Sequence, residues 1–150
     1  MNEKACWFCS VIDDLRYNKI YQTPSGEVIR KICELPAAFA ILDNDQYYPG
    51  YTLVVAKTHA TELYYLPENE STQFCQDMLR VAKAIAAVFQ PQKMNYELLG
   101  NTVAHLHWHL FPRYEWDPNP RRPIWEHSHD RKLLSVKEYT DAIAAIQRVL

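Results

Sequence analysis

Apolar and polar residues follow two different periods along the chain, and each period predicts a different kind of element. Residues 70–89 and 135–150 repeat their apolar positions every three or four residues, which predicts two amphipathic helices. Short runs that are mostly apolar and are bounded by turn residues predict strands. These runs are residues 27–33, 37–42, 52–56, 94–99 and 105–111.

The ends of the helices and the spacing of the strands complete the predicted fold. Ser71 is a candidate N-cap of the first helix, and Pro91 prevents its continuation. Ser135 and Glu138 form a capping box before the second, and residues 9–15 predict a short helical turn. Short turns between the first strands favour antiparallel pairing. We therefore predict an α+β fold, with an antiparallel sheet of about five strands and two main helices.

A long segment at residues 112–132 has no periodic pattern and contains four prolines, so we predict an irregular loop. Arg121 and Arg122 in this loop are candidates for substrate selectivity, although a basic pair in a loop is more often simply solvated. His127 and His129 have polar neighbours, and we predict that both lie in solvent.

Length and composition narrow the class of protein. The 150 residues suit one domain, so we expect residues 1–150 to form a single domain with a C-terminal helical extension from about residue 133. A net charge of −2 argues against nucleic acid as a partner. No run approaches the ~20 apolar residues of a membrane span, and no secretory signal is visible, so we expect a cytoplasmic protein without a membrane anchor. The three glycines lie too far apart for a phosphate-binding loop, so side chains would have to bind any phosphate.

The four cysteines divide into two groups. Cys6 and Cys9 form a CxxC motif, which by itself is consistent with two buried thiols, a redox pair or half of a zinc site. Cys33 and Cys75 stand alone, and we predict that they are core residues.

Three of the six histidines, His105, His107 and His109, alternate with apolar residues. In a strand this spacing places the three imidazoles on one face, while Leu106, Trp108 and Leu110 face the core. Such a row suits a metal site, because imidazole is a common ligand. It equally suits nucleophilic catalysis on phosphorus through a phospho-histidine intermediate. Spacing alone does not choose between the two.

Two segments of the chain resemble the HIT (histidine triad) superfamily. Residues 98–114, LLGNTVAHLHWHLFPRY, resemble the family signature in which three histidines alternate with apolar residues, and residues 43–59 resemble the strand, turn and Lys-x-His segment before it. The resemblance covers roughly residues 5–114. It implies a HIT-like fold and a nucleotide hydrolase or nucleotidyl transferase, similar to dinucleoside (for example diadenosine) polyphosphate hydrolases of the bacterial type with an N-terminal CxxC.

The resemblance also implies a role for each histidine. His107 corresponds to the nucleophile, which family members hold in one tautomer by a hydrogen bond to a main-chain carbonyl. His109 corresponds to the histidine that contacts the α-phosphate and helps the leaving group, and His105 supports the site or ligates metal. The matching substrate-binding positions are Asp43 for ribose, Asn95 on the preceding strand, and Asn101 and Thr102 for phosphate, with Asn101 in place of the usual glutamine. Arg113, directly after the predicted strand, is our candidate for a distal phosphate.

A zinc site is implied by the same resemblance. In bacterial members with the CxxC motif, zinc is held by that pair, the histidine of the Lys-x-His segment and the first triad histidine. The matching ligands are Cys6, Cys9, His59 and His105. Zinc would then be structural, anchoring the N-terminus to the catalytic strand, and we expect no organic cofactor.

We therefore expect cleavage of a phosphoanhydride or phosphoramidate, such as a dinucleoside polyphosphate, through a covalent nucleotidyl-His107 intermediate. The expected partner is a small-molecule nucleotide, and the resemblance implies a homodimer. Two alternatives remain open. One is a metal-dependent phosphohydrolase that uses the histidine row as ligands, and the other is a nucleotide-binding adaptor module without turnover.

Overall fold

The computed structural model describes residues 6–17, 20–23 and 26–150, which form an antiparallel sheet of six strands and three α-helices. The strand order is β1-β2-β3-β4-β6-β5, and every neighbouring pair is antiparallel. The predicted α+β class is confirmed. The α-helices and strands are α1 (Trp7–Tyr17), β1 (Ile20–Gln22), β2 (Val28–Glu34), β3 (Ala38–Leu42), β4 (Thr52–Ala56), α2 (Glu68–Phe89), β5 (Lys93–Leu98), β6 (His107–Arg113) and α3 (Val136–Gln147).

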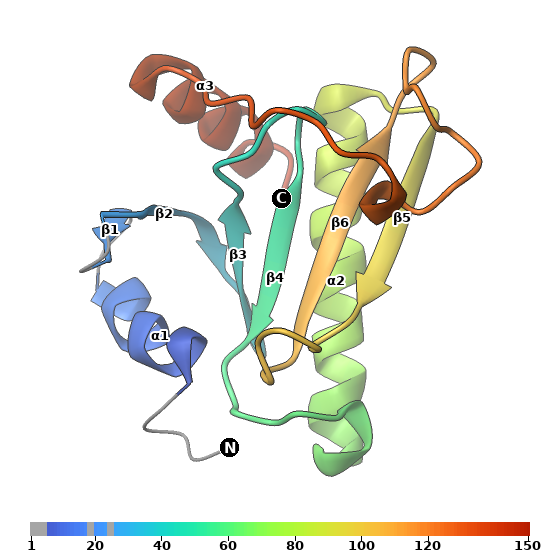
Figure 1. Cartoon of the computed structure of the whole chain (residues 1–150). Helices are drawn as coiled ribbons and strands as arrows, with labels where there is room; N and C mark the ends of the chain where they lie inside the picture. The colour runs from blue at the N-terminus through green and yellow to red at the C-terminus, as the bar shows by residue number, and fades with distance from the viewer. Residues whose placement is uncertain (1–5, 18–19, 24–25) are drawn as a thin grey trace.

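Helices cover both faces of the sheet. The helices α2 and α3 pack on one face, and α1 packs on the other (Figure 1). The strand β3 is buried at every position because its side chains alternate between two cores. Ala38, Ala40 and Leu42 join the core under α2 and α3, whereas Phe39 and Ile41 join the core under α1.

Several element boundaries differ from the prediction. The short turn predicted at residues 9–15 is an eleven-residue helix, α1, because Phe8, Val11, Ile12 and Leu15 have helical spacing and are all buried. The N-cap predicted at Ser71 is wrong, since α2 begins at Glu68. The capping box predicted at the start of α3 is confirmed. The strand β1 is a sixth strand, too short at three residues to leave a recognisable period.

The segment after β6 is irregular apart from the 3₁₀ turn Ile124–Glu126, as the prolines predicted. The prediction that His129 lies in solvent is wrong. Its ring stacks on Tyr47 at 4.2 Å between centroids, and its Nε2 lies 3.0 Å from Asp45 Oδ2. His127 is half-buried and stacks against His129. An aromatic ring and a carboxylate from the segment after β3 therefore draw this loop back onto the sheet.

The remaining predictions for the fold concern cysteines and membranes. Cys33 is half-buried against the core, burial raises the pKa of its thiol to about 11, and Cys75 is also only half-buried. Cys33 therefore packs against the core as predicted, whereas Cys75 is not among the described residues of the core. Among the described residues, no helix is long and apolar enough to cross a membrane.

Candidate functional site

The strand β6 carries two of the three clustered histidines on one face. Trp108 and Leu110 point into the core under α2, so the alternation predicts the opposite face for His107 and His109, and this is confirmed. His105 is not in the strand, contrary to the prediction. The paired register of β4 and β6 ends at Val55 and His107, and the Leu106 amide already donates to the Ala60 carbonyl, beyond the end of β4. His105 therefore lies just before β6, where it is buried.

His107 has one ring nitrogen fixed by the main chain. Its Nδ1 lies 2.6 Å from the His105 carbonyl oxygen. A carbonyl oxygen can only accept a hydrogen bond, so Nδ1 must carry the proton and donate it. The other ring nitrogen, Nε2, then keeps its lone pair. Burial lowers the pKa of His107, which favours the neutral ring. The contact with a main-chain carbonyl is the one that the resemblance implied, and a neutral imidazole with an unprotonated Nε2 can act as a nucleophile.

His109 is oriented by a residue that we did not identify from the sequence, Tyr51. The Tyr51 hydroxyl lies 2.7 Å from His109 Nδ1. Burial raises the pKa of Tyr51, so the phenol keeps its proton. This phenol can donate to Nδ1, and in that tautomer His109 carries its own proton on Nε2. Burial lowers the pKa of His109 to about 4, so the ring is a neutral donor.

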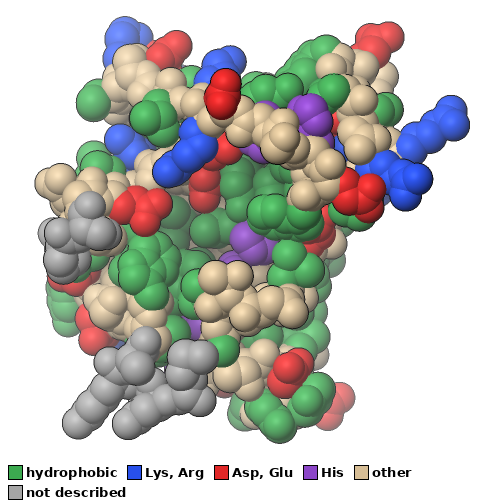
Figure 2. All heavy atoms as spheres, viewed as in Figure 1, with side chains coloured by type: hydrophobic (Ala, Val, Ile, Leu, Met, Phe, Trp, Pro, Cys, Tyr) green, Lys and Arg blue, Asp and Glu red, His purple; other side chains and the backbone are tan. Residues whose placement is uncertain are grey.

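These histidines open into a cavity of about 380 Å³. Asp43, Asn101 and Thr102 line it together with His107 and His109, so the structure brings five of the predicted site residues to one place. In Figure 2, an imidazole is visible in a hollow surrounded mainly by hydrophobic side chains. The other lining residues are Phe8, Tyr51, Leu53, Leu99, Gly100, Val103 and Trp125.

The polar rim of this cavity comes from two loops. Gly100 has a φ of +84°, a conformation that favours glycine, and it turns the chain so that Asn101 and Thr102 follow at the cavity edge. Asp43 lies at the end of β3 and accepts a hydrogen bond from the Asp45 amide at 2.7 Å. Burial raises the pKa of Asp43 to about 6. The carboxylate is therefore close to its own titration near neutral pH, and a ligand that donates hydrogen bonds would stabilise its charged form.

Asn95 and Arg113 do not line this cavity. The Arg113 guanidinium is buried, forms an ion pair with Asp117, and donates to Asn95 Oδ1 at 2.6 Å. It also donates to the carbonyls of Asn119 at 2.8 Å and Arg122 at 3.0 Å. These contacts hold the loop after β6. The Arg122 side chain is exposed near Glu126, and Arg121 is exposed, in agreement with the solvated alternative.

Cys6, Cys9, His59 and His105 form a group that could hold a metal ion. His105 Nδ1 lies 3.5 Å from Cys6 Sγ, 3.6 Å from Cys9 Sγ and 3.2 Å from His59 Nδ1. Tetrahedral zinc with two sulfur and two nitrogen ligands requires separations of about 3.3–3.8 Å between ligand atoms. All four ligand atoms here lie within 4.8 Å of one another, so small shifts of the side chains would complete such a site. His105 Nε2 lies 2.8 Å from the Ala56 carbonyl oxygen, so the imidazole proton is on Nε2 and is donated to that oxygen. The unprotonated Nδ1 can then bind a metal ion.

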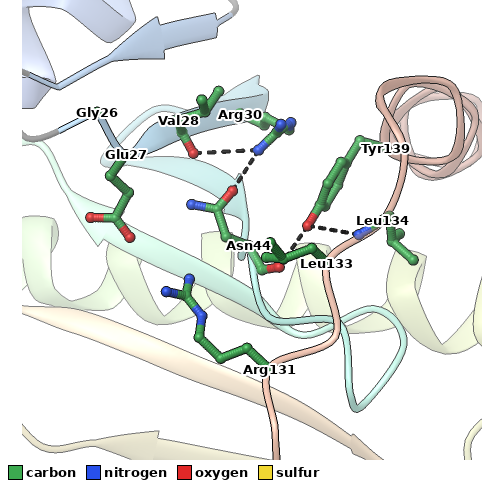
Figure 3. Close-up of a pocket in the computed structure, with 9 residues that line it drawn as sticks. All are labelled: Gly26, Glu27, Val28, Arg30, Asn44, Arg131, Leu133, Leu134 and Tyr139. Atoms are coloured by element: carbon green, nitrogen blue, oxygen red, sulfur yellow. Dashed lines mark hydrogen bonds between the residues drawn. The ribbon is translucent and has the colours of Figure 1, made fainter.

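A second cavity of about 530 Å³ lies beside Asn44, and we call it the Arg30 cavity (Figure 3). Arg30 donates to Asn44 Oδ1, and its guanidinium lies 3.9 Å from the centroid of the Tyr139 ring. The Tyr139 hydroxyl donates to the Asn44 carbonyl at 2.6 Å and accepts from the Leu134 amide. Most polar groups here bind one another, and together they fasten α3 to the segment after β3.

A sheet flanked by helices on both faces, with alternating histidines on one strand, defines a protein of the histidine triad class. The family model of the HIT domain matches residues 28–116, and the chain belongs to this family. It is 28% identical to "Protein hit" of Bacillus subtilis over 146 residues, which cover 93% of this chain and 92% of that protein. It is 27% identical over 112 residues to the adenosine 5′-monophosphoramidase HNT1 of Saccharomyces cerevisiae, covering 74% of this chain and 64% of HNT1.

Solved structures agree with this assignment. A histidine triad protein from Bradyrhizobium japonicum superposes with a TM-score of 0.74 at 28% identity, covering 81% of this chain and 90% of that chain. A zinc-bound histidine triad family protein from Mycobacterium smegmatis superposes with a TM-score of 0.68, covering 98% of this chain and 96% of that chain. Its identity is 21%, so this second likeness shows the fold alone.

Proposed function

We propose that this protein is a nucleotide hydrolase or nucleotidyl transferase that acts through a covalent nucleotidyl-His107 intermediate. The observation that carries the proposal is the fixed tautomer of His107, whose Nδ1 proton is held by the His105 carbonyl while Nε2 keeps a lone pair. The substrate would be a phosphoanhydride or phosphoramidate of a nucleotide, such as a dinucleoside polyphosphate. The adenosine 5′-monophosphoramidase activity of the yeast relative HNT1 supports the phosphoramidate part of this substrate class.

In the first step, the Nε2 lone pair of His107 forms a bond to the α-phosphorus, and the bond between phosphorus and the leaving group breaks with its electron pair going to the leaving group. His109 Nε2–H donates a hydrogen bond to an oxygen of the phosphoryl group or leaving group, which stabilises the charge that develops there. In the second step, water or another hydroxyl acceptor attacks phosphorus and loses its proton to solvent, and the bond between phosphorus and His107 Nε2 breaks with its electron pair returning to Nε2. An amine released in the first step takes up a proton from solvent. Asp43 would accept hydrogen bonds from the ribose hydroxyls, and Asn101 and Thr102 would donate to phosphate.

We propose that Cys6, Cys9, His59 and His105 hold a structural zinc ion. The bound ion would tie α1 to the end of β4 and would orient His105, whose carbonyl oxygen accepts the proton of His107. The distances between the ligand atoms and the zinc-bound neighbour from Mycobacterium smegmatis support this assignment. Because the four side chains complete a tetrahedral set, the ion would have no open position for substrate.

The test is to trap the intermediate. We expect brief incubation with a panel of nucleoside phosphoramidates and dinucleoside polyphosphates to add the mass of one nucleoside monophosphate, read by intact-protein mass spectrometry. His107→Asn should be folded and should show neither adduct nor turnover. Turnover by His107→Asn would overturn the covalent mechanism. Activity lost on chelation and restored by metal, without an adduct, would favour the metal-dependent alternative, and tight nucleotide binding with no product would favour the adaptor.

We also propose that the protein is a homodimer, as the resemblance implies. Light scattering tests this directly, and a single species of 17.6 kDa would contradict it.

A further inference from the structure

In the sheet, β3 and β5 lie on opposite sides of the strands β4 and β6, so Asp43 and Glu97 mark two different sides of the histidines. Asp43 follows β3 on one side, His109 lies on β6, and Glu97 lies on β5 directly opposite His109. Neighbouring strands are about 4.8 Å apart, so the strands of Asp43 and Glu97 are separated by about 14 Å. If ribose lies at Asp43 and the α-phosphate lies at the imidazoles, the remaining part of the substrate extends toward β5.

A tryptophan is held in place on that side. Trp125 packs edge-to-face on His109 and on Phe111, with centroids 5.4 Å apart in both pairs, and its indole N–H donates to the Glu97 carboxylate. Trp125 nevertheless remains 56% exposed and lines the cavity, whereas Glu97 is half-buried and adjoins the cavity through Trp125. These contacts hold the indole in one position while leaving much of its surface open to a ligand.

The charges on this side do not suit a phosphate chain. Among the described residues that line the cavity there is no Lys or Arg. The nearby Arg113 is engaged by Asp117, and Arg122 lies next to Glu126. Proteins commonly hold phosphates with Arg or Lys. A carboxylate beside an aromatic ring instead attracts ammonium groups, through ion pairing and cation–π interaction.

We propose that Glu97 and Trp125 form a leaving-group subsite that selects leaving groups bearing an ammonium group over anionic ones. The proposal rests on the proposed function and narrows its substrate class. It favours nucleoside phosphoramidates of cationic amines over dinucleoside polyphosphates, whose leaving groups are anionic. Glu97 supplies the charge, and Trp125 supplies the surface against which the leaving group packs.

The test uses three adenosine 5′-phosphoramidates of equal chain length, whose far ends carry an ammonium, a hydroxyl or a carboxylate group. We expect the wild-type protein to prefer the ammonium substrate in kcat/KM. In Glu97→Gln, which keeps an acceptor for the Trp125 indole, the ratio of ammonium to carboxylate kcat/KM should fall about tenfold, since each charged substrate gains or loses a few-fold. Trp125→Ala should lower the kcat/KM of all three substrates.

The matched control is Glu115→Gln, which removes an exposed carboxylate from the loop after β6 and should leave the ratio unchanged. A wild-type protein without the ammonium preference would overturn the subsite, as would a Glu97→Gln variant with an unchanged ratio. The proposed function itself fails if the wild-type protein cleaves neither the three phosphoramidates nor any dinucleoside polyphosphate. That outcome differs from turnover without charge selectivity, which would contradict only the subsite.

Discussion

Two consecutive residues line different cavities: Asp43 lines the cavity of His107 and His109, which we call the triad cavity, and Asn44 lines the Arg30 cavity. The Arg30 cavity is larger, at about 530 Å³ against about 380 Å³. Most of its polar groups, however, already bind one another. In the triad cavity, His107 and His109 are each held by one ring nitrogen and present the other to the cavity. Chemistry depends on which polar atoms the protein leaves available, and cavity size does not report this.

The largest expected effect contrasts one residue from each cavity. We expect His107→Asn to lower turnover by at least about 10³-fold, because it removes the attacking nitrogen. Tyr139→Phe, in the Arg30 cavity, should leave turnover within about twofold and should lower the free energy of unfolding by about 1 kcal/mol, because the hydroxyl bonds to Asn44 and Leu134 are lost.

Steady-state kinetics and urea unfolding of both variants check this contrast. If Tyr139→Phe lost activity in proportion to His107→Asn while remaining folded, the Arg30 cavity would belong to the site, and the distinction between the two cavities would be lost.

Local pattern explains much of what could be predicted from the sequence. The alternation around Trp108 and Leu110 places His107 and His109 on one face, and it needs only the geometry of a strand. The sequence could not predict that Asn95 and Arg113 lie outside the cavity. Their positions depend on contacts of Arg113 with Asn95 and with Asp117, which the folded loop brings to the guanidinium. Such partners are set by tertiary structure and leave no periodic signal.

Tyr51 shows where a signal was present but weak. It is one of ten tyrosines, so its identity alone attracts no attention. It lies two residues before Leu53, which pairs with His109, and strand alternation therefore puts Tyr51 on the same face as the imidazoles. Trp125 had no comparable signal, because it comes from an irregular segment whose path depends on contacts with Glu97 and Phe111.

A smaller expected effect concerns the metal group next to the triad cavity. We expect the isolated protein to contain about one zinc ion per chain, and Cys9→Ser or chelation to lower the free energy of unfolding by about 3 kcal/mol, since a ligand bound only by the folded state stabilises it by mass action. The matched control is Cys75→Ser, at a half-buried cysteine outside the metal group. It should change the free energy of unfolding by less than about 1 kcal/mol.

Elemental analysis and thermal unfolding with and without added zinc provide the measurement. If the protein carries no zinc and its unfolding does not respond to added zinc, the four residues have no metal role. They are then thiols and imidazoles that only pack against one another.

Of the losses of turnover that we expect, that of Tyr51→Phe is smaller than that of His107→Asn, because the substitution removes only the hydrogen bond between the Tyr51 hydroxyl and His109 Nδ1. Without it, His109 can place its proton on either nitrogen, so kcat should fall about tenfold while KM changes little. Tyr47→Phe, whose ring stacks on His129 away from the triad, is the matched control. Because burial lowers the pKa of His109 to about 4, its ring stays neutral across the neutral range, and the loss should be equal at about pH 5.5 and about pH 8. A loss confined to the acid side would instead mean that Tyr51 controls the charge of His109 rather than the position of its proton.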